Sequence, residues 1–259
     1  MDNEQYTAPA RRFPELPVGK QSGEVPGHFG DPLTVEHALW SRGGGHANPG
    51  KPMFLLLHGW GSNEQDMADL MSYIAPYNDY ASLRAPLALP AQYRNPEDDG
   101  VRATWFHDAV PAGEDRDHDA YAAAVAIDDW VADNIPETRD VVPLGFSQGG
   151  LLAVHLLRLN PRRYRAVVCL SGFWAQGAVP GTAPADADLD ELQIPVFFGF
   201  GDKDQVLPRF EHLAMSAWLE EHTYLKYREY PKLDHAVSLS EFDDIRQWLS
   251  DNNITSGIM

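Results

Sequence analysis

Cysteine is almost absent from this chain, which has a single one among its 259 residues. A lone cysteine excludes an internal disulfide. Cys169 lies in the apolar run Ala166–Leu170, and cysteines in apolar surroundings are usually inert. We therefore expect a buried structural thiol rather than a reactive one.

Long apolar runs are also lacking. No run in the sequence approaches the roughly 20 apolar residues that a membrane-spanning helix needs. The first residues, Met1–Gln5, have neither the basic nor the apolar region of a secretory signal. These absences predict a soluble protein without integral membrane association, most simply located in the cytoplasm.

Basic residues are scarce, with 20 Lys and Arg against 38 Asp and Glu, for a formal net charge of −18. Nucleic acids and anionic membrane surfaces would be repelled by such a charge. Neither is therefore expected as a partner, and the excess of acid is most simply a feature that keeps the protein in solution.

The chain is long enough for one large core, since 44% of its residues are hydrophobic and no break in composition demands a second domain. Residues 1–30 are rich in Pro, Gly and polar residues and show no clear period. We expect them to form an extended or partly disordered N-terminal arm. Residues 31–259 are expected to form a single domain.

Apolar segments of strand length alternate with segments of helical period through this domain. Such alternation predicts an α/β fold in which a mostly parallel central sheet has helices on both faces. The expected strands are residues 33–40, 53–57, 80–85, 141–145, 165–170, 195–200 and 224–230. The main expected helices lie after residue 61, at 119–134, after residue 150, before residue 224, and after residue 238.

Two helices carry more specific expectations. In the helix before residue 224, Phe210, Leu213, Ala214, Ala217 and Trp218 recur at near-ideal helical spacing, which predicts that they form its buried face. The last helix opens with Ser238-Leu239-Ser240-Glu241, the pattern of a capping box.

Two long connections, residues 86–117 and 171–193, interrupt the alternation. Loops of this length are usually functional or disordered, and the sequence leaves open whether they form a lid. Each contains an aromatic pair, Trp105–Phe106 and Phe173–Trp174. These side chains are candidates for the wall of a substrate pocket. The equal alternative is that they anchor the loops to the body of the protein.

The central motif is Gly145-Phe146-Ser147-Gln148-Gly149, which lies between an apolar strand and an apolar helix. A strand, a sharp turn and a helix around G-x-S-x-G are typical of a nucleophile elbow. The turn holds the serine in a strained backbone conformation that raises its hydroxyl above the sheet, and side chains at the two glycines would collide with neighbouring segments. Ser147 is therefore the predicted nucleophile.

A serine hydroxyl needs a base to take its proton during attack, and a carboxylate must orient that base. His235 follows the last expected strand, and an acidic loop, Gly201–Pro208, follows the strand before it. The order Ser, Asp, His, with each member at a strand end, is the order of α/β-hydrolases. The residues alone leave the choice between Asp202 and Asp204 open, because aspartates in tight turns often accept backbone N–H groups instead.

The negatively charged oxygen of a tetrahedral intermediate needs backbone N–H donors that are already in place. The residue after the nucleophile, Gln148, supplies one. The second normally comes from the loop after an early strand, here His58-Gly59-Trp60-Gly61, and we assign it to Trp60. The predicted machinery requires no metal and no organic cofactor.

Taken together, these motifs resemble the carboxylesterase/phospholipase family, the acyl-protein-thioesterase-like branch of the α/β-hydrolases. The resemblance extends from about Met53 to Trp248 and rests on Leu57–Glu64, Gly145–Gly150, Ser171–Gly172, Gly201–Val206 and Asp234–His235. It implies that Asp204, the last aspartate of G-x-x-D, is the acid, and that Trp60 is the second amide donor. The chain departs from the family at Phe200, where histidine is usual, and at Asp234, where glycine is usual.

These motifs favour a serine carboxylesterase that hydrolyses small neutral carboxylic esters through an acyl-enzyme on Ser147. Acyl-protein thioesterase and lysophospholipase activities remain open, because they use the same machinery. A non-catalytic ligand-binding homologue is the alternative from a different class.

Overall fold

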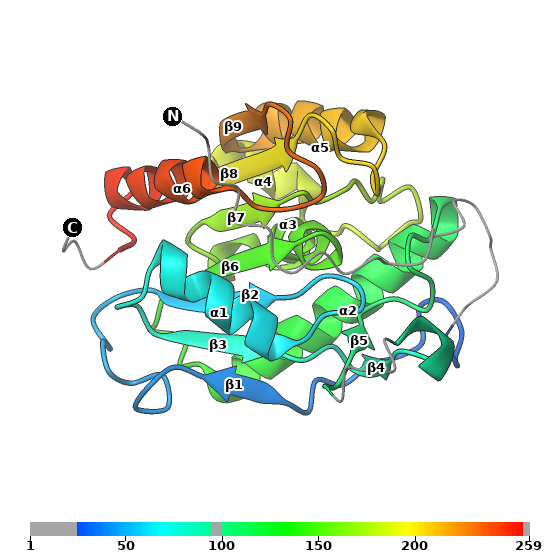
Figure 1. Cartoon of the computed structure of the whole chain (residues 1–259), viewed down its shortest axis with the longest axis horizontal. Coiled ribbons are helices and arrows are strands. Elements are labelled where there is room, and N and C mark those ends of the chain that lie inside the picture. Colours follow the sequence, from blue (N-terminus) through cyan, green and yellow to red (C-terminus); the bar gives the residue numbers. More distant parts are fainter. Residues whose placement is uncertain (1–24, 95–99, 256–259) are drawn as a thin grey trace.

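The computed structural model describes residues 25–94 and 100–255, and its centre is a sheet of seven strands. The strands follow the order β1-β3-β2-β6-β7-β8-β9 across the sheet (Figure 1). In chain order they are β1 (Ala38–Trp40), β2 (Met53–Leu57), β3 (Tyr80–Leu83), β6 (Val141–Phe146), β7 (Val167–Leu170), β8 (Pro195–Gly201) and β9 (Tyr224–Tyr230). Strand β1 runs antiparallel to β3, and the other neighbouring pairs are parallel. The predicted mostly parallel sheet is confirmed.

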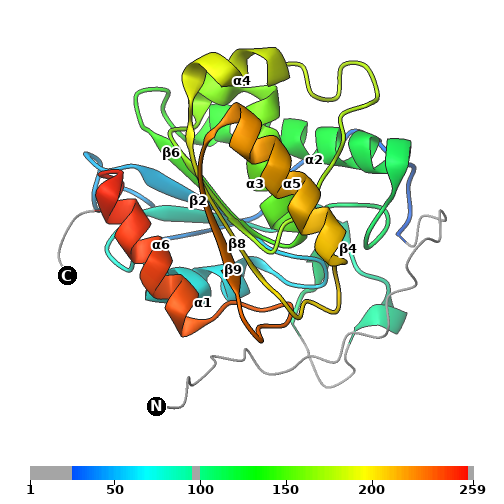
Figure 2. The same cartoon turned by 90° about the horizontal axis from the view of Figure 1, so that it is seen from above.

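Helices cover both faces of the sheet (Figure 2). Helices α1 (Glu64–Ile74) and α6 (Leu239–Asp251) pack on one face. Helices α2 (Gly113–Asn134), α3 (Gln148–Leu159), α4 (Asp186–Leu192) and α5 (Arg209–His222) lie on the other. A strand between two helical layers has no solvated face, which is why all five residues of β2 are apolar and buried. Within the described residues, no helix is long and apolar enough to span a membrane.

The two long connections contain more regular structure than the sequence indicated. In the first, β4 (Leu87–Ala88) pairs with β5 (Ala103–Thr104), and a short 3-10 helix, η1 (Ala91–Tyr93), lies between them. Helix α2 begins at Gly113, six residues before its predicted start. The second connection contains α4, and the 3-10 helix η2 (Pro161–Arg163) follows α3.

The first six residues of α2 escaped prediction, and the polar residue Asp117 among them holds a loop rather than packs in the core. The carboxylate of Asp117 accepts the N–H groups of Gly177 at 2.8 Å and of Val179 at 3.2 Å, in the second connection. The carboxylate of Asp119 accepts the N–H groups of His107 and Gly30. Long-range contacts of this kind leave no periodic signal in the sequence.

The predicted buried face of α5 is wrong. Its buried residues are His212, Met215 and Leu219, whereas Phe210 is 67% exposed and Leu213 is 40% exposed. The ring of His212 makes two polar contacts beneath the helix, with Asp204 and with the carbonyl of Gly172. Those contacts fix the rotation of the helix about its axis, so a polar residue rather than the apolar spacing decides which face points inward.

Half of the predicted capping box at the start of α6 is present. The hydroxyl of Ser238 accepts the N–H of Glu241 at 3.2 Å, as an N-cap residue does. The carboxylate of Glu241 does not return the interaction. It is buried, and neither of its oxygens has a hydrogen-bond partner among the described residues. Glu241 lies instead against Gly199 of β8, where an added Cβ would be 2.3 Å from its Oε1 atom.

The predicted buried thiol and part of the predicted arm can be located. Cys169 is fully buried, and burial raises its pKa, so the thiol stays neutral.

Most of the predicted arm, residues 1–24, lies outside the described residues. From residue 25 onward the chain follows the body, where the N–H of Val25 donates to the carbonyl of His107 at 3.0 Å. The division into an arm and a single domain stays a prediction.

Candidate active site

The candidate site lies between β2 and β6, where the connections to the next strands run in opposite directions across the sheet. From β2 the chain passes through α1 to β3, and from β6 it passes through α3 to β7 on the opposite face of the sheet. Ligands bind open α/β sheets at such switch points, beyond the carboxyl ends of the strands. Gly59, just after β2, is so close to the end of β6 that an added Cβ would be 3.2 Å from Ser147 Cβ.

Ser147 occupies the sharp turn between β6 and α3. Its φ of 56° and ψ of −115° lie in a region that side chains rarely adopt, and such strain is commonly found at functional sites. The flanking glycines permit the turn. A Cβ at Gly145 would be 2.0 Å from the carbonyl oxygen of Gly149, and one at Gly149 would be 2.0 Å from that of Leu57. The predicted collisions at both glycines are therefore present.

Geometry separates the two candidate aspartates. Asp204 Oδ2 is 2.7 Å from His235 Nδ1, while Asp204 Oδ1 accepts the N–H groups of Val206 and Leu207. Asp202 points elsewhere, and its Oδ1 atom accepts the N–H of Lys232 at 2.5 Å. Asp204 is thus the aspartate that meets His235, and Asp202 stabilises a turn.

The carboxylate of Asp204 is ionised although its side chain is only 2% exposed. Burial would raise its pKa, but hydrogen bonds from His212 and His235 outweigh burial and hold the pKa well below its usual range. A permanently negative Asp204 can orient the imidazole of His235 and stabilise its cationic form.

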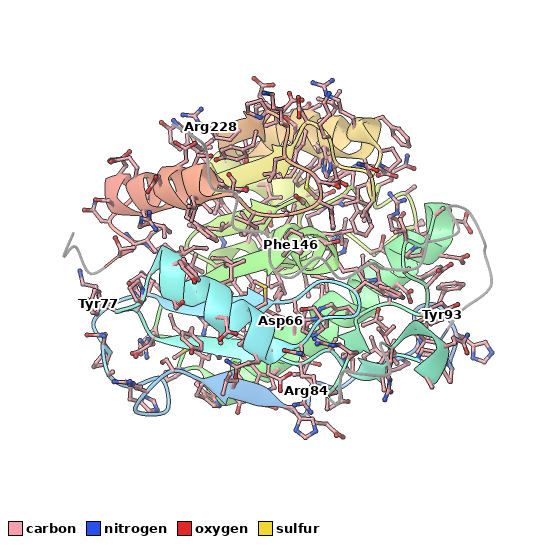
Figure 3. All side chains as sticks on the ribbon, viewed as in Figure 1. Asp66, Tyr77, Arg84, Tyr93, Phe146 and Arg228 are labelled. Carbon is pink, nitrogen blue, oxygen red and sulfur yellow. The ribbon has the colours of Figure 1, made fainter. Side chains whose placement is uncertain are left out.

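His235 lies beside the elbow. Its ring packs on Phe146, the residue before Ser147, with ring centroids 4.8 Å apart (Figure 3 labels Phe146). Because Nδ1 faces Asp204, Nε2 is the nitrogen left for Ser147. The two side chains are not hydrogen-bonded to each other in this structure, and such bonds often tighten only when substrate is present.

The two predicted oxyanion donors lie on the turns that meet here. Gln148 is the first residue of α3, and N–H groups in the first turn have no acceptor within their helix. Trp60 follows Gly59 in the turn after β2, and its largely buried ring packs with Leu89, Ala109 and Tyr93. Both backbone N–H groups therefore belong to segments adjoining Ser147.

The end of β5 and the segment after it support these turns, a role that the sequence did not indicate. The side chain of Gln148 accepts hydrogen bonds from Thr104 Oγ1 at 3.0 Å and from the N–H of Trp105 at 3.2 Å. The indole of Trp105 donates to the carbonyl of His58 at 2.9 Å. His58 is itself buried, and burial lowers its pKa to about 4, so a neutral ring accepts the N–H of Ala85.

The predicted pocket role of the aromatic pairs is not supported. Trp105, Phe106 and Phe173 have no exposed surface, so they cannot form an accessible wall in this structure. Trp174 is partly exposed, but its ring packs at a tilt against Trp218 and contacts the guanidinium of Arg158 in the last turn of α3. Arg158 lies ten residues beyond Gln148, which places it about 15 Å along the helix from the elbow. The alternative, that the pairs anchor the loops, fits these contacts.

Asp234, a departure from the family pattern, joins the two loops that carry Asp204 and His235. Its Oδ1 atom accepts the N–H of Gln205 at 2.9 Å and the N–H of His235 at 2.8 Å. A glycine could not make either bond. The charge beside His235 is therefore directed at backbone N–H groups.

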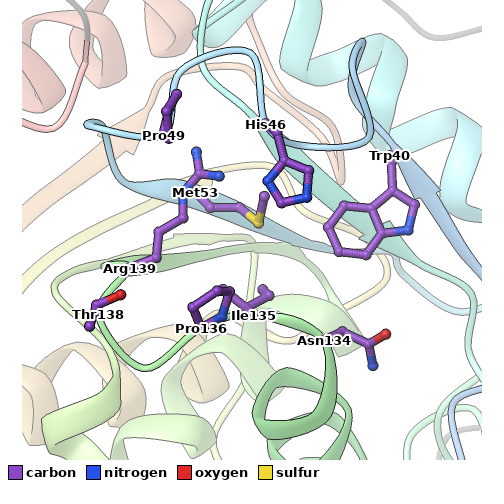
Figure 4. A pocket seen from close by; sticks show the side chains of 9 residues that line it. All are labelled: Trp40, His46, Pro49, Met53, Asn134, Ile135, Pro136, Thr138 and Arg139. Atoms are coloured by element: carbon purple, nitrogen blue, oxygen red, sulfur yellow. The ribbon is translucent and has the colours of Figure 1, made fainter.

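A separate pocket of about 160 Å³ lies at the opposite edge of the sheet (Figure 4). Its lining includes Met53 at the start of β2, Asn134 at the end of α2 and Arg139 just before β6. These residues are at the amino ends of the strands, so the pocket does not belong to the candidate site. Across residues 25–94 and 100–255, no group of three or more His, Cys, Asp or Glu side chains is arranged to hold a metal ion.

Comparison with known proteins points to the same family that the sequence motifs resemble. A family model described as phospholipase/carboxylesterase matches residues 45–253, which include all five predicted catalytic and oxyanion residues. Acyl-protein thioesterase 1 of Kluyveromyces lactis is 24% identical over 220 residues, which cover 79% of this chain and 93% of that protein. Acyl-protein thioesterase 1 of Saccharomyces cerevisiae is 21% identical over 213 residues, covering 78% and 92% respectively.

Solved structures share the fold. A phospholipase/carboxylesterase from Dyadobacter fermentans superposes with a TM-score of 0.61 at 19% identity, covering 83% of this chain and 96% of that one. Acyl-protein thioesterase 2 of Zea mays gives a TM-score of 0.61 at 19% identity, covering 83% and 98%. The predicted α/β-hydrolase architecture is confirmed by these superpositions.

Proposed function

This chain belongs to the phospholipase/carboxylesterase family, and from that premise we propose that it hydrolyses carboxylic esters through a covalent acyl-enzyme on Ser147. The family match covers most of the chain. The observation that carries the assignment of residues is the 2.7 Å contact between Asp204 Oδ2 and His235 Nδ1, made beside the strained turn that presents Ser147.

In the first half of the proposed reaction, Ser147 Oγ attacks the carbonyl carbon of the ester while its proton passes to His235 Nε2. Asp204 stabilises the imidazolium that forms. The tetrahedral intermediate collapses, the bond to the alcohol breaks, and the alcohol leaves with the proton from His235. The acyl group remains on Ser147.

In the second half, His235 takes a proton from water as the water attacks the acyl-enzyme. Collapse of the second intermediate returns this proton to Ser147 and releases the carboxylic acid. In both halves the negative oxygen is bound by the backbone N–H groups of Trp60 and Gln148, which need no reorganisation during the reaction.

A fluorophosphonate probe tests the nucleophile. We expect one covalent label, located on Ser147 by peptide mass spectrometry and absent from Ser147→Ala. The exposed Ser250 of α6 provides a matched control, since Ser250→Ala should be labelled like the wild type. A folded wild-type protein that takes no label, or that is labelled elsewhere, would refute the proposed mechanism.

Thioester hydrolysis is the second candidate, favoured by the acyl-protein thioesterases among the relatives. We propose small neutral esters as the preferred substrates, because a net charge of −18 repels polyanionic acyl carriers. A cytoplasmic location also stays a prediction from the sequence.

The substrate proposal is tested by comparing kcat/KM for acetyl, butyryl, octanoyl and palmitoyl p-nitrophenyl esters with kcat/KM for palmitoyl-coenzyme A, at low and high salt. We expect the short neutral esters to give the highest values, with little dependence on salt. A clear preference for the palmitoyl substrates would favour the thioesterase or lysophospholipase activity instead.

A further inference from the structure

A second histidine contacts the aspartate of the candidate triad. His212 Nε2 is 3.1 Å from Asp204 Oδ2, the same oxygen that faces His235. His212 Nδ1 is 2.9 Å from the carbonyl oxygen of Gly172. Its side chain is fully buried, and its ring stacks on Phe200 with centroids 4.3 Å apart at an angle of 14°. His212 thus joins the loop after β8 to the loop after β7.

Both groups that face the ring nitrogens of His212 are hydrogen-bond acceptors. A carboxylate oxygen lies at one nitrogen and a backbone carbonyl at the other. A neutral imidazole has one N–H, so it would direct a lone pair at one of these two oxygens, inside the protein and at hydrogen-bond distance. The imidazolium donates at both nitrogens and satisfies both acceptors.

On the basis of the proposed function, we infer that His212 is a positioning residue. It is a buried imidazolium that shares the carboxylate of Asp204 with His235. It would act in two ways. It fixes the orientation in which Asp204 Oδ2 meets His235, and it offsets the negative charge that stabilises the cationic form of His235. The second effect keeps His235 available as a base at lower pH.

The hydrogen bonds around Asp204 support the first effect. Its Oδ1 atom accepts the N–H groups of Val206 and Leu207 at 2.9 and 2.8 Å, while Oδ2 receives both histidines. The backbone donors fix one oxygen, and His212, whose other ring nitrogen meets the carbonyl of Gly172, helps to fix the second. Without His212, that oxygen would be held by His235 alone, the residue that it has to orient.

The charges nearby support the second effect. Around His212 and Asp204, the charged or titratable groups nearby include Asp234, the ion pairs Arg209–Glu229, Arg116–Glu211 and Lys203–Asp202, Tyr227 and Cys169. Each ion pair is neutral overall, and burial raises the pKa of the Tyr227 hydroxyl and of the Cys169 thiol, which stay uncharged. The cation on His212 is therefore the group that balances the carboxylates beside His235.

Two substitutions separate orientation from charge. His212→Gln keeps an amide N–H that can reach Asp204 but removes the charge. His212→Phe keeps a ring to stack on Phe200 but donates nothing. In both variants we expect the ascending limb of kcat/KM against pH to move upward by about one pH unit, because an opposing charge within hydrogen-bond distance is lost. The plateau should fall by about tenfold in His212→Phe and by less in His212→Gln.

His222, the last residue of α5, is the matched control. Its Nδ1 atom lies 2.6 Å from Oδ1 of Asp190 in α4, so His222→Gln also removes a contact between a histidine of α5 and an aspartate. It should leave the pH profile unchanged. Failure of the proposed function would appear separately, as loss of fluorophosphonate labelling at Ser147 in the wild type.

Nitrogen-15 NMR of the ring of His212 in the wild-type protein gives a test that needs no variant. We expect both ring nitrogens to carry protons at neutral pH. An unprotonated nitrogen on His212 would overturn the inference, as would variants whose label at Ser147 is intact and whose ascending limb coincides with that of the wild type.

Discussion

The side-chain oxygen of Gln148 accepts a hydrogen bond from the hydroxyl of Thr104 at 3.0 Å. The same oxygen accepts the N–H of Trp105, and the amide nitrogen donates to the carbonyl of Ala109 at 2.9 Å. These bonds connect the start of α3, directly after Ser147, to the end of β5 and the segment that follows it. In the proposed mechanism the backbone N–H of Gln148 binds the oxyanion, and its side chain holds that backbone in place.

Gln148→Met should therefore lower kcat, although methionine keeps nearly the same volume. It makes none of these bonds and leaves the N–H of Trp105 and the carbonyl of Ala109 without their partner in a buried site, which costs about 1–3 kcal/mol of stability for each unsatisfied group. Displacement of one oxyanion donor should reduce kcat by about 100-fold. Steady-state kinetics and denaturant unfolding measure both effects.

Gln65→Met is the control for this prediction, because Gln65 is exposed on α1 and its amide bonds only to the side chain of Asp69 among the described residues. It should change neither kcat nor stability. If Gln148→Met kept the wild-type kcat, the side chain of Gln148 would not be what positions the donor.

The two aspartates of the acidic loop should respond differently to the same chemical change. Asp204→Asn replaces the acceptor of the His235 N–H with an amide that favours the wrong tautomer, and we expect kcat to fall by about 10⁴-fold. Asp202→Asn removes a charged acceptor from the N–H of Lys232 and should lower stability with little effect on kcat. Measuring kcat and Tm for both variants checks this, and the reverse pattern would move the catalytic role to Asp202.

The sequence predicts the sheet and the elbow well because both depend on residues close together in the chain. An apolar run such as Met53–Leu57 announces a strand buried on both faces. The glycines at 145 and 149 are required by contacts within one strand, turn and helix and with the adjacent β2. In both cases the apolar or glycine pattern and the packing that requires it lie within a short segment of the chain. Little information from the rest of the fold is therefore needed.

Side-chain orientation across the sheet was less predictable. The apolar spacing of α5 favours Phe210 and Leu213 as its buried face, yet His212 faces inward, where its two ring nitrogens meet Asp204 and the carbonyl of Gly172. Those partners lie 8 and 40 residues away in the chain. Likewise, the sequence predicts that Trp105 lies in a loop, and nothing near it indicates that its indole donates to the carbonyl of His58. Contacts of this kind have no local signature.

The close approach of α3 to β2 should make position 149 intolerant of any side chain. In Gly149→Ala the added Cβ would lie 2.0 Å from the carbonyl oxygen and 2.4 Å from the carbonyl carbon of Leu57, both backbone atoms that cannot rotate away. We expect a loss of about 3 kcal/mol or more in the free energy of unfolding. The control is Gly50→Ala, where nothing lies within 4 Å. Equal midpoints of denaturant unfolding for the two variants would contradict the tight approach.

Glu241 gives the stability of the protein a specific dependence on pH. Burial, and then the charge of Asp244, raise the pKa of this carboxyl to about 8, above its ordinary value of 4.5. Between these values the unfolded chain releases the proton while the folded protein keeps it. The unfolded state then binds fewer protons than the folded state, so the free energy of unfolding falls as pH rises.

Glu241→Gln should remove this dependence, because an amide does not titrate and has nearly the same shape as the protonated acid. Near pH 4.5 and below, the variant and the wild type should differ little in stability. As pH rises toward 8 the variant should become the more stable of the two, by up to about 1.4 kcal/mol for each pH unit crossed. Denaturant unfolding at a series of pH values measures the difference, with Glu220→Gln, at an exposed position of α5, as the control. A difference that stays constant across this range would mean that Glu241 is already ionised in the folded protein.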